Sequence, residues 1–231
     1  MILEIRGLSF KFEKEGNYIF KDVSLNIFPG NMILLKGESG IGKSTFCKAI
    51  CGVLTNEKNL SIQGSVKYNK TNILDLSLPE ISKFLGVVFQ ESDNQLFMPT
   101  IEDEIAFGLE NLAMEPSKIN EILEEVIQRY GLENIRYKNP KKCSGGEKQL
   151  VVFASIVVMN RPFLILDEAF SQVDQNKRDI VRQELLNLKQ KGIGILLVDH
   201  ESYFDDIADD IYYLHDTRLY KTGELAYANS N

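Results

Sequence analysis

The chain has 231 residues, of which 44% are hydrophobic, so it is long enough and apolar enough to bury a sizeable core. Its formal net charge of -7 at pH 7 argues against nucleic acid as a partner, because an acidic surface repels a phosphate backbone. The three cysteines form neither a disulfide framework nor a zinc-ligand spacing. We interpret Cys47 and Cys51 as small buried residues of a protein in a reducing compartment.

The N-terminal segment MILEIRGLSF carries an acid and has no continuous apolar stretch, so it is more typical of a first β-strand than of a signal peptide. We therefore expect that the protein is not exported. The longest apolar run, Leu150 to Met159, is about half of the roughly 20 residues that a membrane-spanning helix needs. Any association with a membrane is expected to depend on a partner protein.

The first third of the chain is patterned as strands around one helix. A helix is predicted over Lys43–Ile50, ending near Gly52. Strands are predicted at Ile2–Phe12, Ile19–Phe28, Met32–Lys36 and Gly86–Phe89, and a strand pair is predicted around Gly64–Tyr68.

From Thr100 to about Leu132 the pattern is helical and acidic, until Asn139-Pro140 breaks it and a third helix begins after Ser144. Alternation of strand and helix then returns, with predicted elements at Phe163–Leu166, Gln175–Lys191, Ile193–Val198 and a hairpin around Tyr212–Tyr220. We interpret residues 1–231 as a single domain, with an α/β core formed by 1–90 and 161–231 and a helical subdomain over about 91–160.

One segment matches the phosphate-binding pattern G-x-x-x-x-G-K-[ST] between a predicted strand and a predicted helix. Glycines let backbone N–H groups turn toward an anion, the lysine reaches β- and γ-phosphates, and the serine hydroxyl ligates Mg²⁺. A Gly-rich turn before a helix is the plain alternative. The predicted ligand is ATP, held by Gly37, Glu38, Ser39, Gly40, Ile41, Gly42, Lys43, Ser44 and the following Thr45.

A second signal is the apolar strand that ends in Asp167 and Glu168. Buried strands tolerate acids poorly, so two carboxylates at a strand end indicate a place where a cation or a water is held. Asp167 is predicted to hold Mg²⁺ and Glu168 to take the proton from an attacking water. A strand that runs into a solvated turn would look the same.

A third signal is Ser144-Gly145-Gly146-Glu147. As local structure it predicts a capping box, S-x-x-E, that opens a helix. The two glycines also leave bare N–H groups at the positive end of that helix, which favours an anion.

In order and spacing, these three motifs resemble those of ABC ATPases over nearly the whole chain. The resemblance implies a P-loop NTPase core with an antiparallel β subdomain and an inserted α-helical subdomain, and ATP and Mg²⁺ as cofactors. It also implies that two cassettes close head to tail, so that Ser144, Gly145 and Gly146 serve the partner's nucleotide.

The same resemblance implies roles for four further residues. Gln90 would sense Mg²⁺ and act with Glu168 in catalysis, and His200 would contact the γ-phosphate. Asp174 would lie in the loop that crosses the dimer interface, although alone it also predicts a helix cap. Phe12 would stack on adenine, or pack in the core beside Phe10 on the same strand face.

A finer resemblance covers Phe89 to Phe97 and the helix TIEDEIAFGLENL, which are similar to the ATPases of energy-coupling-factor transporters. It implies a peripheral motor on the cytoplasmic face of the cell membrane that drives import of a vitamin or transition metal ion. The implied partners are a second ABC ATPase, a transmembrane scaffold and a substrate-binding membrane subunit. Another ABC importer or exporter, or a weakly hydrolytic regulatory subunit, is the alternative reading. Leu96, Phe97 and Met98 would dock the scaffold or pack within the subdomain.

The chain departs from the family pattern at Cys143 and Glu147 of the signature, at Leu150 and at Ala169. A carboxylate near a γ-phosphate is repelled, so we expect slow hydrolysis at the site that Glu147 joins. An asymmetric heterodimer is therefore favoured over a homodimer. The chain continues only briefly past the last hairpin, so pairing without ATP is expected to be weak.

Overall fold

A six-stranded sheet forms the centre of the fold, with strand order β10-β9-β3-β8-β7-β6. The structure is a computed structural model that describes residues 1–13, 15–56 and 60–224. Five strands are parallel and β10 is antiparallel to β9. The strands are β3 (Met32–Lys36), β6 (Leu85–Val88), β7 (Phe163–Asp167), β8 (Gly194–Val198), β9 (Asp210–His215) and β10 (Arg218–Lys221).

Both faces of this sheet are covered, which explains why its central strands are apolar without alternation. Successive side chains point to opposite faces. Leu164 and Leu166 therefore join the core beneath the helical part of the molecule, whereas Phe163 and Ile165 join the core shared with the second sheet. The same division holds along β3 and β8.

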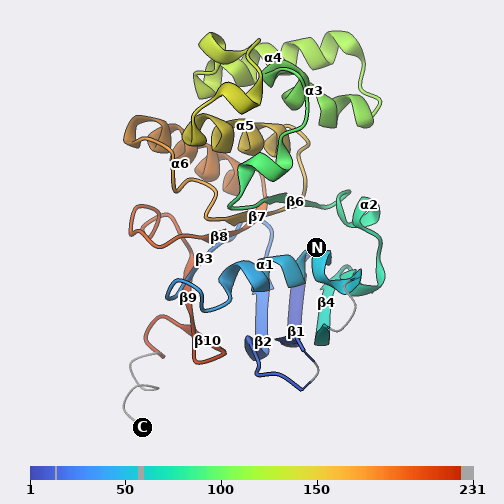
Figure 1. The fold of residues 1–231 in the computed structure, drawn as a ribbon, viewed down its shortest axis with the longest axis vertical. Coiled ribbons are helices and arrows are strands. Elements are labelled where there is room, and N and C mark those ends of the chain that lie inside the picture. Colours follow the sequence, from blue (N-terminus) through green and yellow to red (C-terminus); the bar gives the residue numbers. More distant parts are fainter. Residues whose placement is uncertain (14, 57–59, 225–231) are drawn as a thin grey trace.

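The second sheet is antiparallel, with strand order β2-β1-β4-β5. Helix α1 (Lys43–Ile50) packs into the core between the two sheets (Figure 1). Lys21 N donates to Thr217 O at 2.7 Å, which ties β2 to the β9–β10 hairpin. The strands of this sheet are β1 (Leu3–Lys11), β2 (Phe20–Ile27), β4 (Ser61–Tyr68) and β5 (Thr71–Asn72).

Helices α3 and α4 lie beyond α5 at the end of the molecule farthest from the antiparallel sheet (Figure 1). The helices are α2 (Leu78–Ile81), α3 (Ile101–Asn111), α4 (Pro116–Tyr130), α5 (Gly145–Val157) and α6 (Gln175–Gln190). Thr100 caps α3 by accepting from Asp103 N at 3.1 Å, and Gly131 ends α4 with a φ of 63°. No helix in the described ranges is long and apolar enough to cross a membrane.

The predicted α/β class with an antiparallel sheet and a helical part is confirmed. Strand β3 and helix α1 have the predicted bounds, and the strand predicted at Gly86–Phe89 is β6, displaced by one residue. The strand pair predicted around Gly64–Tyr68 is β4 with the two-residue strand β5, whose bounds were not predicted, and the short helix α2 was not predicted. Strand β5 and helix α2 are both too short to show a periodicity.

One ion pair joins the helical part to the core. Arg129 on α4 donates from Nη1 to Glu184 Oε2 on α6 at 3.0 Å, and the Glu184 side chain is only 1% exposed. A buried carboxylate without its cation is costly, so this pair is expected to be structural.

We predict that Arg129→Met lowers the free energy of unfolding by about 2 kcal/mol, because it leaves Glu184 buried beside an apolar chain. Urea titration followed by circular dichroism measures this change. Lys118→Met is the matched control, since it removes a cation from an exposed pair with Glu121, and its unfolding midpoint should equal that of the wild type. Equal midpoints for all three proteins would contradict the prediction.

Candidate functional site

The loop between β3 and α1 has the geometry of an anion cradle. Gly42 is the N-cap of α1 and has a φ of 113°, in the left-handed region. A Cβ atom at this position would lie 2.4 Å from Ile19 Cγ2, so both conformation and space require glycine. The loop therefore brings backbone N–H groups and the positive end of α1 to one point.

Lys43 is buried at the first turn of α1. Its Nζ donates to the carbonyl oxygens of Gly37 at 3.0 Å and of Glu38 at 2.9 Å. Burial lowers the pKa of Lys43, while Glu168 and Asp167 act in the opposite direction. The ammonium is thus held inside the cradle by neutral acceptors that a phosphate oxygen can replace.

Asp167 is the last residue of β7 and is 1% exposed. The alternative interpretation, in which the strand runs into a solvated turn, is therefore wrong for Asp167. Ser44 Oγ donates to Asp167 Oδ1 at 3.1 Å. Asp167 Oδ2 is buried and has no hydrogen-bond partner among the residues that the structure describes. Burial raises the pKa of Asp167, and the Ser44 bond opposes that rise.

These groups fit a small divalent cation. The hydroxyl of Ser44 and the unpartnered oxygen of Asp167 are the hard oxygen ligands that Mg²⁺ prefers. Within the described residues no group of three or more His, Cys, Asp or Glu side chains could hold a metal by itself. A cation here would therefore share its coordination with water and with phosphate oxygens of a bound nucleotide.

Two separate segments hold the carboxylate of Glu168. Gln90, two residues after β6, donates from Nε2 to Glu168 Oε2 at 2.6 Å. His200, two residues after β8, lies with Nε2 2.6 Å from Glu168 Oε1. Glu168 itself has a φ of 49°, a conformation that costs energy for a non-glycine residue and is frequent at active sites. The carboxylate is thus oriented at the edge of the cradle, as a general base requires.

The structure brings eight of the predicted site residues around one cavity of about 230 Å³, whose walls are polar, and Gly37, Asp167 and His200 do not line it. Glu38 and Ile41 of the loop do not line it: Glu38 supplies a backbone acceptor for Lys43, and Ile41 packs against the core. The lining residues are Ser39, Gly40, Gly42, Lys43, Ser44, Thr45, Gln90 and Glu168.

Ser144, Gly145 and Gly146 do not line this cavity. They begin α5, where Ser144 N and Ser144 Oγ both donate to Glu147 Oε2, at 2.7 and 2.9 Å, so the predicted capping box is present. The bond from Ser144 N lowers the pKa of Glu147, so this carboxylate is charged at neutral pH. A Cβ at Gly146 would lie 2.4 Å from the backbone oxygen of Gln172, so glycine is required there by the loop packed against it.

Two other predicted residues also lie outside the cavity. Asp174 caps α6 by accepting from Lys177 N at 3.1 Å. Phe12 is 52% exposed and touches Phe10 edge-on, with ring centroids 5.1 Å apart. The interpretation that Phe12 packs in the core is therefore wrong. The exposed face of its ring is available to another ring.

Sequence reasoning missed two residues of the site. Gln149 is buried, donates to Ser171 Oγ at 3.1 Å and accepts from Gln172 N at 2.9 Å, so it joins α5 to the loop before α6. Lys48, one turn after Ser44, lines a neighbouring cavity with Asp167. For Gln149, the sequence signal was a lone amide at the start of an apolar helix. For Lys48, it was the i,i+4 spacing from Ser44.

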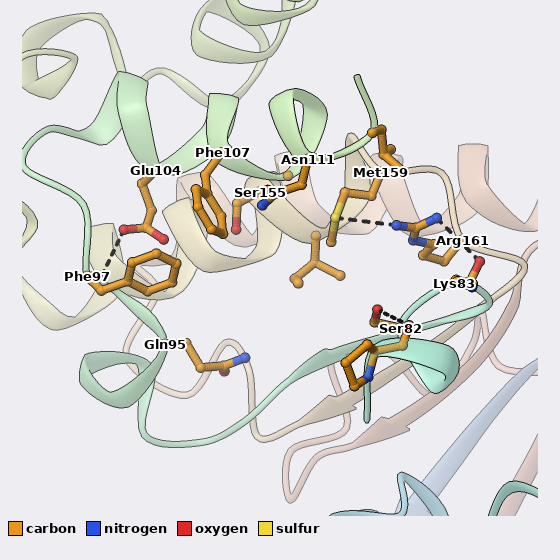
Figure 2. A pocket seen from close by; sticks show the side chains of 14 residues that line it. Ser82, Lys83, Gln95, Phe97, Glu104, Phe107, Asn111, Ser155, Met159 and Arg161 are labelled. Carbon is orange, nitrogen blue, oxygen red and sulfur yellow. Dashed lines mark hydrogen bonds between the residues drawn. The ribbon is translucent and has the colours of Figure 1, made fainter. Parts of the chain in front are cut away.

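A larger groove of about 550 Å³ lies between α3, α5 and the segment after β6. Ile156 is one of its lining residues. Phe97 and Phe107 line it together on one side (Figure 2). Leu96, Phe97 and Met98 were expected either to dock a scaffold subunit or to pack within the helical subdomain. Leu96 is buried in the core, whereas Phe97 is 62% exposed. Gln95 lines both this groove and the neighbouring cavity that Lys48 and Asp167 line.

Comparisons with known proteins agree with this geometry. A family profile described as ABC transporter matches residues 20–171. The energy-coupling factor transporter ATP-binding protein EcfA of Pediococcus pentosaceus is 31% identical over 229 residues, or 96% of this chain and 78% of that protein. The protein of the same name from Methanocaldococcus jannaschii is 31% identical over 225 residues, with 96% and 78% covered.

Two solved structures share the fold. A dimeric ATP-binding cassette in a post-hydrolysis state, bound to ADP and Pi, has a TM-score of 0.82 and 25% identity, and the match covers 96% of this chain and 98% of that one. The cbiO1 protein of Clostridium perfringens, part of the ABC transporter complex cbiONQ, has a TM-score of 0.78 and 24% identity, with 99% and 90% covered.

We predict that Lys43→Ala weakens ATP binding on the order of 100-fold, because it removes charge-assisted bonds worth about 3 kcal/mol to the phosphates. Isothermal calorimetry with ATP measures the change. Lys67→Ala, which removes an exposed lysine of β4, is the control and should bind ATP as the wild type does. Unchanged ATP affinity in Lys43→Ala would contradict the assignment of this loop as the phosphate-binding site.

Proposed function

The chain belongs to the ABC transporter family and is an ATP hydrolase of that family, and on this premise we propose that it is the motor subunit of an energy-coupling-factor transporter. The transporter would import a vitamin or a transition metal ion across the membrane to which this subunit binds peripherally from the cytoplasmic side. The observation that carries the proposal is the relatedness to EcfA proteins over nearly the whole chain. The assembled set of Lys43, Asp167, Glu168 and His200 supports a hydrolytic subunit rather than a regulatory one.

In the proposed mechanism the loop amides and Lys43 bind the β- and γ-phosphates of ATP. Ser44 and Asp167 would hold Mg²⁺, which when bound offsets the negative charge of the phosphate oxygens. Glu168 accepts the proton of the water that attacks the γ-phosphate. Gln90 and His200 orient Glu168 through their bonds to its two oxygens, so they act as positioning groups for the base.

A second cassette would complete this site. The signature residues Ser144 to Gly146 lie outside the chain's own phosphate cavity, and a solved relative of similar fold is a dimer. The proposal is that they contact the partner's nucleotide and that Asp174 lies at the interface. Phe12 would stack on adenine, because its ring is exposed and can pack against another ring.

The charged Glu147 favours a heterodimer over a homodimer. Its Oε2 accepts from both the amide and the hydroxyl of Ser144, the groups that a γ-phosphate would otherwise use. In a homodimer this obstacle would occur at both sites. In a heterodimer, this chain's own nucleotide meets the partner's signature, and only the partner's nucleotide meets Glu147.

The groove beside α3 is the proposed contact with the transmembrane scaffold. Its wall includes the exposed Phe97, and Gln95 lines both the groove and the cavity next to the phosphate cavity, which Lys48 and Asp167 also line. Glu104, buried on α3, accepts from Phe97 N at 2.9 Å and from Met98 N at 2.8 Å. These two bonds hold the backbone of the groove wall in place. A preformed apolar groove of this kind suits the apolar face of a short helix from a membrane subunit.

The proposed function is tested by purifying the complex from the source cells through a tag on this chain. We expect a different ABC ATPase chain and membrane subunits in stoichiometric amounts. The reconstituted complex should take up its vitamin or metal substrate only with ATP inside the vesicle. Purification with an export complex, or uptake without ATP, would reject the proposal.

We predict that Glu168→Gln lowers ATP turnover on the order of 10²–10⁴-fold while ATP still binds, because the amide keeps the shape but cannot accept the proton. Single-turnover phosphate release and calorimetry on the same protein separate the two effects. Glu133→Gln, on the helical part, should behave as the wild type. Wild-type turnover in Glu168→Gln would show that another group is the base.

We predict that Glu147→Gln raises turnover of the assembled complex about threefold to tenfold, because it removes one negative charge beside the partner's γ-phosphate. Glutamine can keep the capping box, so stability should not change. Steady-state phosphate release from the complex gives the rate, and a thermal melt checks the fold. A lower rate would mean that the carboxylate assists the site, and the asymmetry argument would fail.

A further inference from the structure

Arg178, in the first turns of α6, contacts two loops of the nucleotide site at once. Its guanidinium donates from Nε to Val173 O at 3.0 Å and from Nη2 to Ser171 O at 3.4 Å. Its Nη1 donates to Glu201 Oε2. The Arg178 side chain is only 12% exposed, although it carries a full charge. One largely buried fork therefore contacts both the loop that follows Glu168 and the segment that follows β8.

The bond to Glu201 reaches the turn that carries His200. Glu201 N donates to Asp199 Oδ1 at 3.1 Å, so a side chain and the backbone close a turn with His200 at its centre. His200 Nε2 lies 2.6 Å from Glu168 Oε1. The direction of the imidazole therefore depends on how this turn is held, and Arg178 holds it through the Glu201 carboxylate.

The other two bonds of Arg178 reach the loop that joins β7 to α6. Gln149 holds the same loop from α5, through bonds to Ser171 Oγ and Gln172 N. A guanidinium presents its N–H donors in one rigid plane. The two loop carbonyls and the Glu201 carboxylate are therefore fixed relative to one another, and the loop itself is anchored to the core.

Arg182, one turn further along α6, provides a matched comparison. It donates to Tyr203 O at 2.9 Å and to Asp206 Oδ1 at 2.8 Å, three and six residues after His200. Its side chain is 22% exposed, so it is buried to a similar degree as Arg178. Loss of either arginine weakens the packing of α6 on the segment after β8, but only Arg178 contacts Glu201 among the residues that the structure describes.

We propose that Arg178 is a positioning residue for ATP hydrolysis, which keeps His200 directed at Glu168 by fixing the Glu201 turn against the loop over residues 171–173. A misplacement of about 1 Å in an active site can lower a rate on the order of 100-fold, so a loosened turn is expected to affect turnover. The inference rests on the proposed roles of His200 and Glu168, and it does not depend on the substrate of the transporter.

The test measures ATP turnover by the purified complex that contains this chain. Arg178→Met should lower kcat about tenfold and leave KM for ATP unchanged, because the residue acts on the base and not on nucleotide binding. Arg182→Met is the control and should keep the wild-type kcat. A wild-type kcat in Arg178→Met, or an equal loss in Arg182→Met, would overturn the inference.

A double variant separates an action through His200 from a general loosening of the fold. His200→Ala alone should lower kcat on the order of 100-fold. Adding Arg178→Met should lower it no further, since the imidazole that Arg178 positions is then gone. A further tenfold loss in the double variant would overturn the inference alone. A wild-type kcat in His200→Ala would instead reject the proposed role of His200, and the inference with it.

A milder variant keeps the test available if Arg178→Met melts well below the wild type. Glu201 is 58% exposed, so Glu201→Gln should fold normally while it weakens the bond to Arg178 by removing the charge of the acceptor. Its kcat should fall about threefold, and no additional fall should occur when it is combined with His200→Ala. A wild-type kcat in Glu201→Gln would overturn the inference.

Discussion

The nucleotide site depends on one constraint, which is that a buried strand ends in two carboxylates. Strand β7 is covered on both faces, so Asp167 and Glu168 leave the core at a point where water cannot solvate them fully. Other segments must therefore stabilise them. Ser44 does so for Asp167, and Gln90 and His200 do so for Glu168. The need to satisfy these acids brings the phosphate loop and the ends of β6 and β8 together.

This arrangement also connects the nucleotide to the groove. The segment after β6 includes Gln90, which bonds to Glu168, and continues to Phe97 in the groove wall. Gln95 closes it back onto the strand, accepting from Phe89 N at 2.7 Å and donating to Val87 O at 3.0 Å. Because this loop is short and internally bonded, a shift of Gln90 with the nucleotide is expected to reach Phe97.

The signature helix is connected to the same centre by a different route. Buried Gln149 on α5 bonds to Ser171 and Gln172, which follow the Glu168 turn. Gly146 lies so close to the backbone of Gln172 that any side chain would collide with it. In the proposed head-to-tail pair, helix α5, which would present Ser144 to the partner's nucleotide, is thereby connected to Glu168, the proposed base for this chain's own nucleotide.

The sequence by itself determined the phosphate loop, the acids of β7, the capping box of Ser144 and the α/β class. These features are local, because backbone conformation, periodicity and capping depend on neighbouring residues. Only the tertiary structure decided that Phe12 is exposed and that Leu96 and Phe97 have different environments. It also showed that Gln149 is a buried link and that Arg178 contacts both the loop after Glu168 and Glu201. Each of these depends on which distant segments pack around a side chain, and spacing along the chain does not specify that packing.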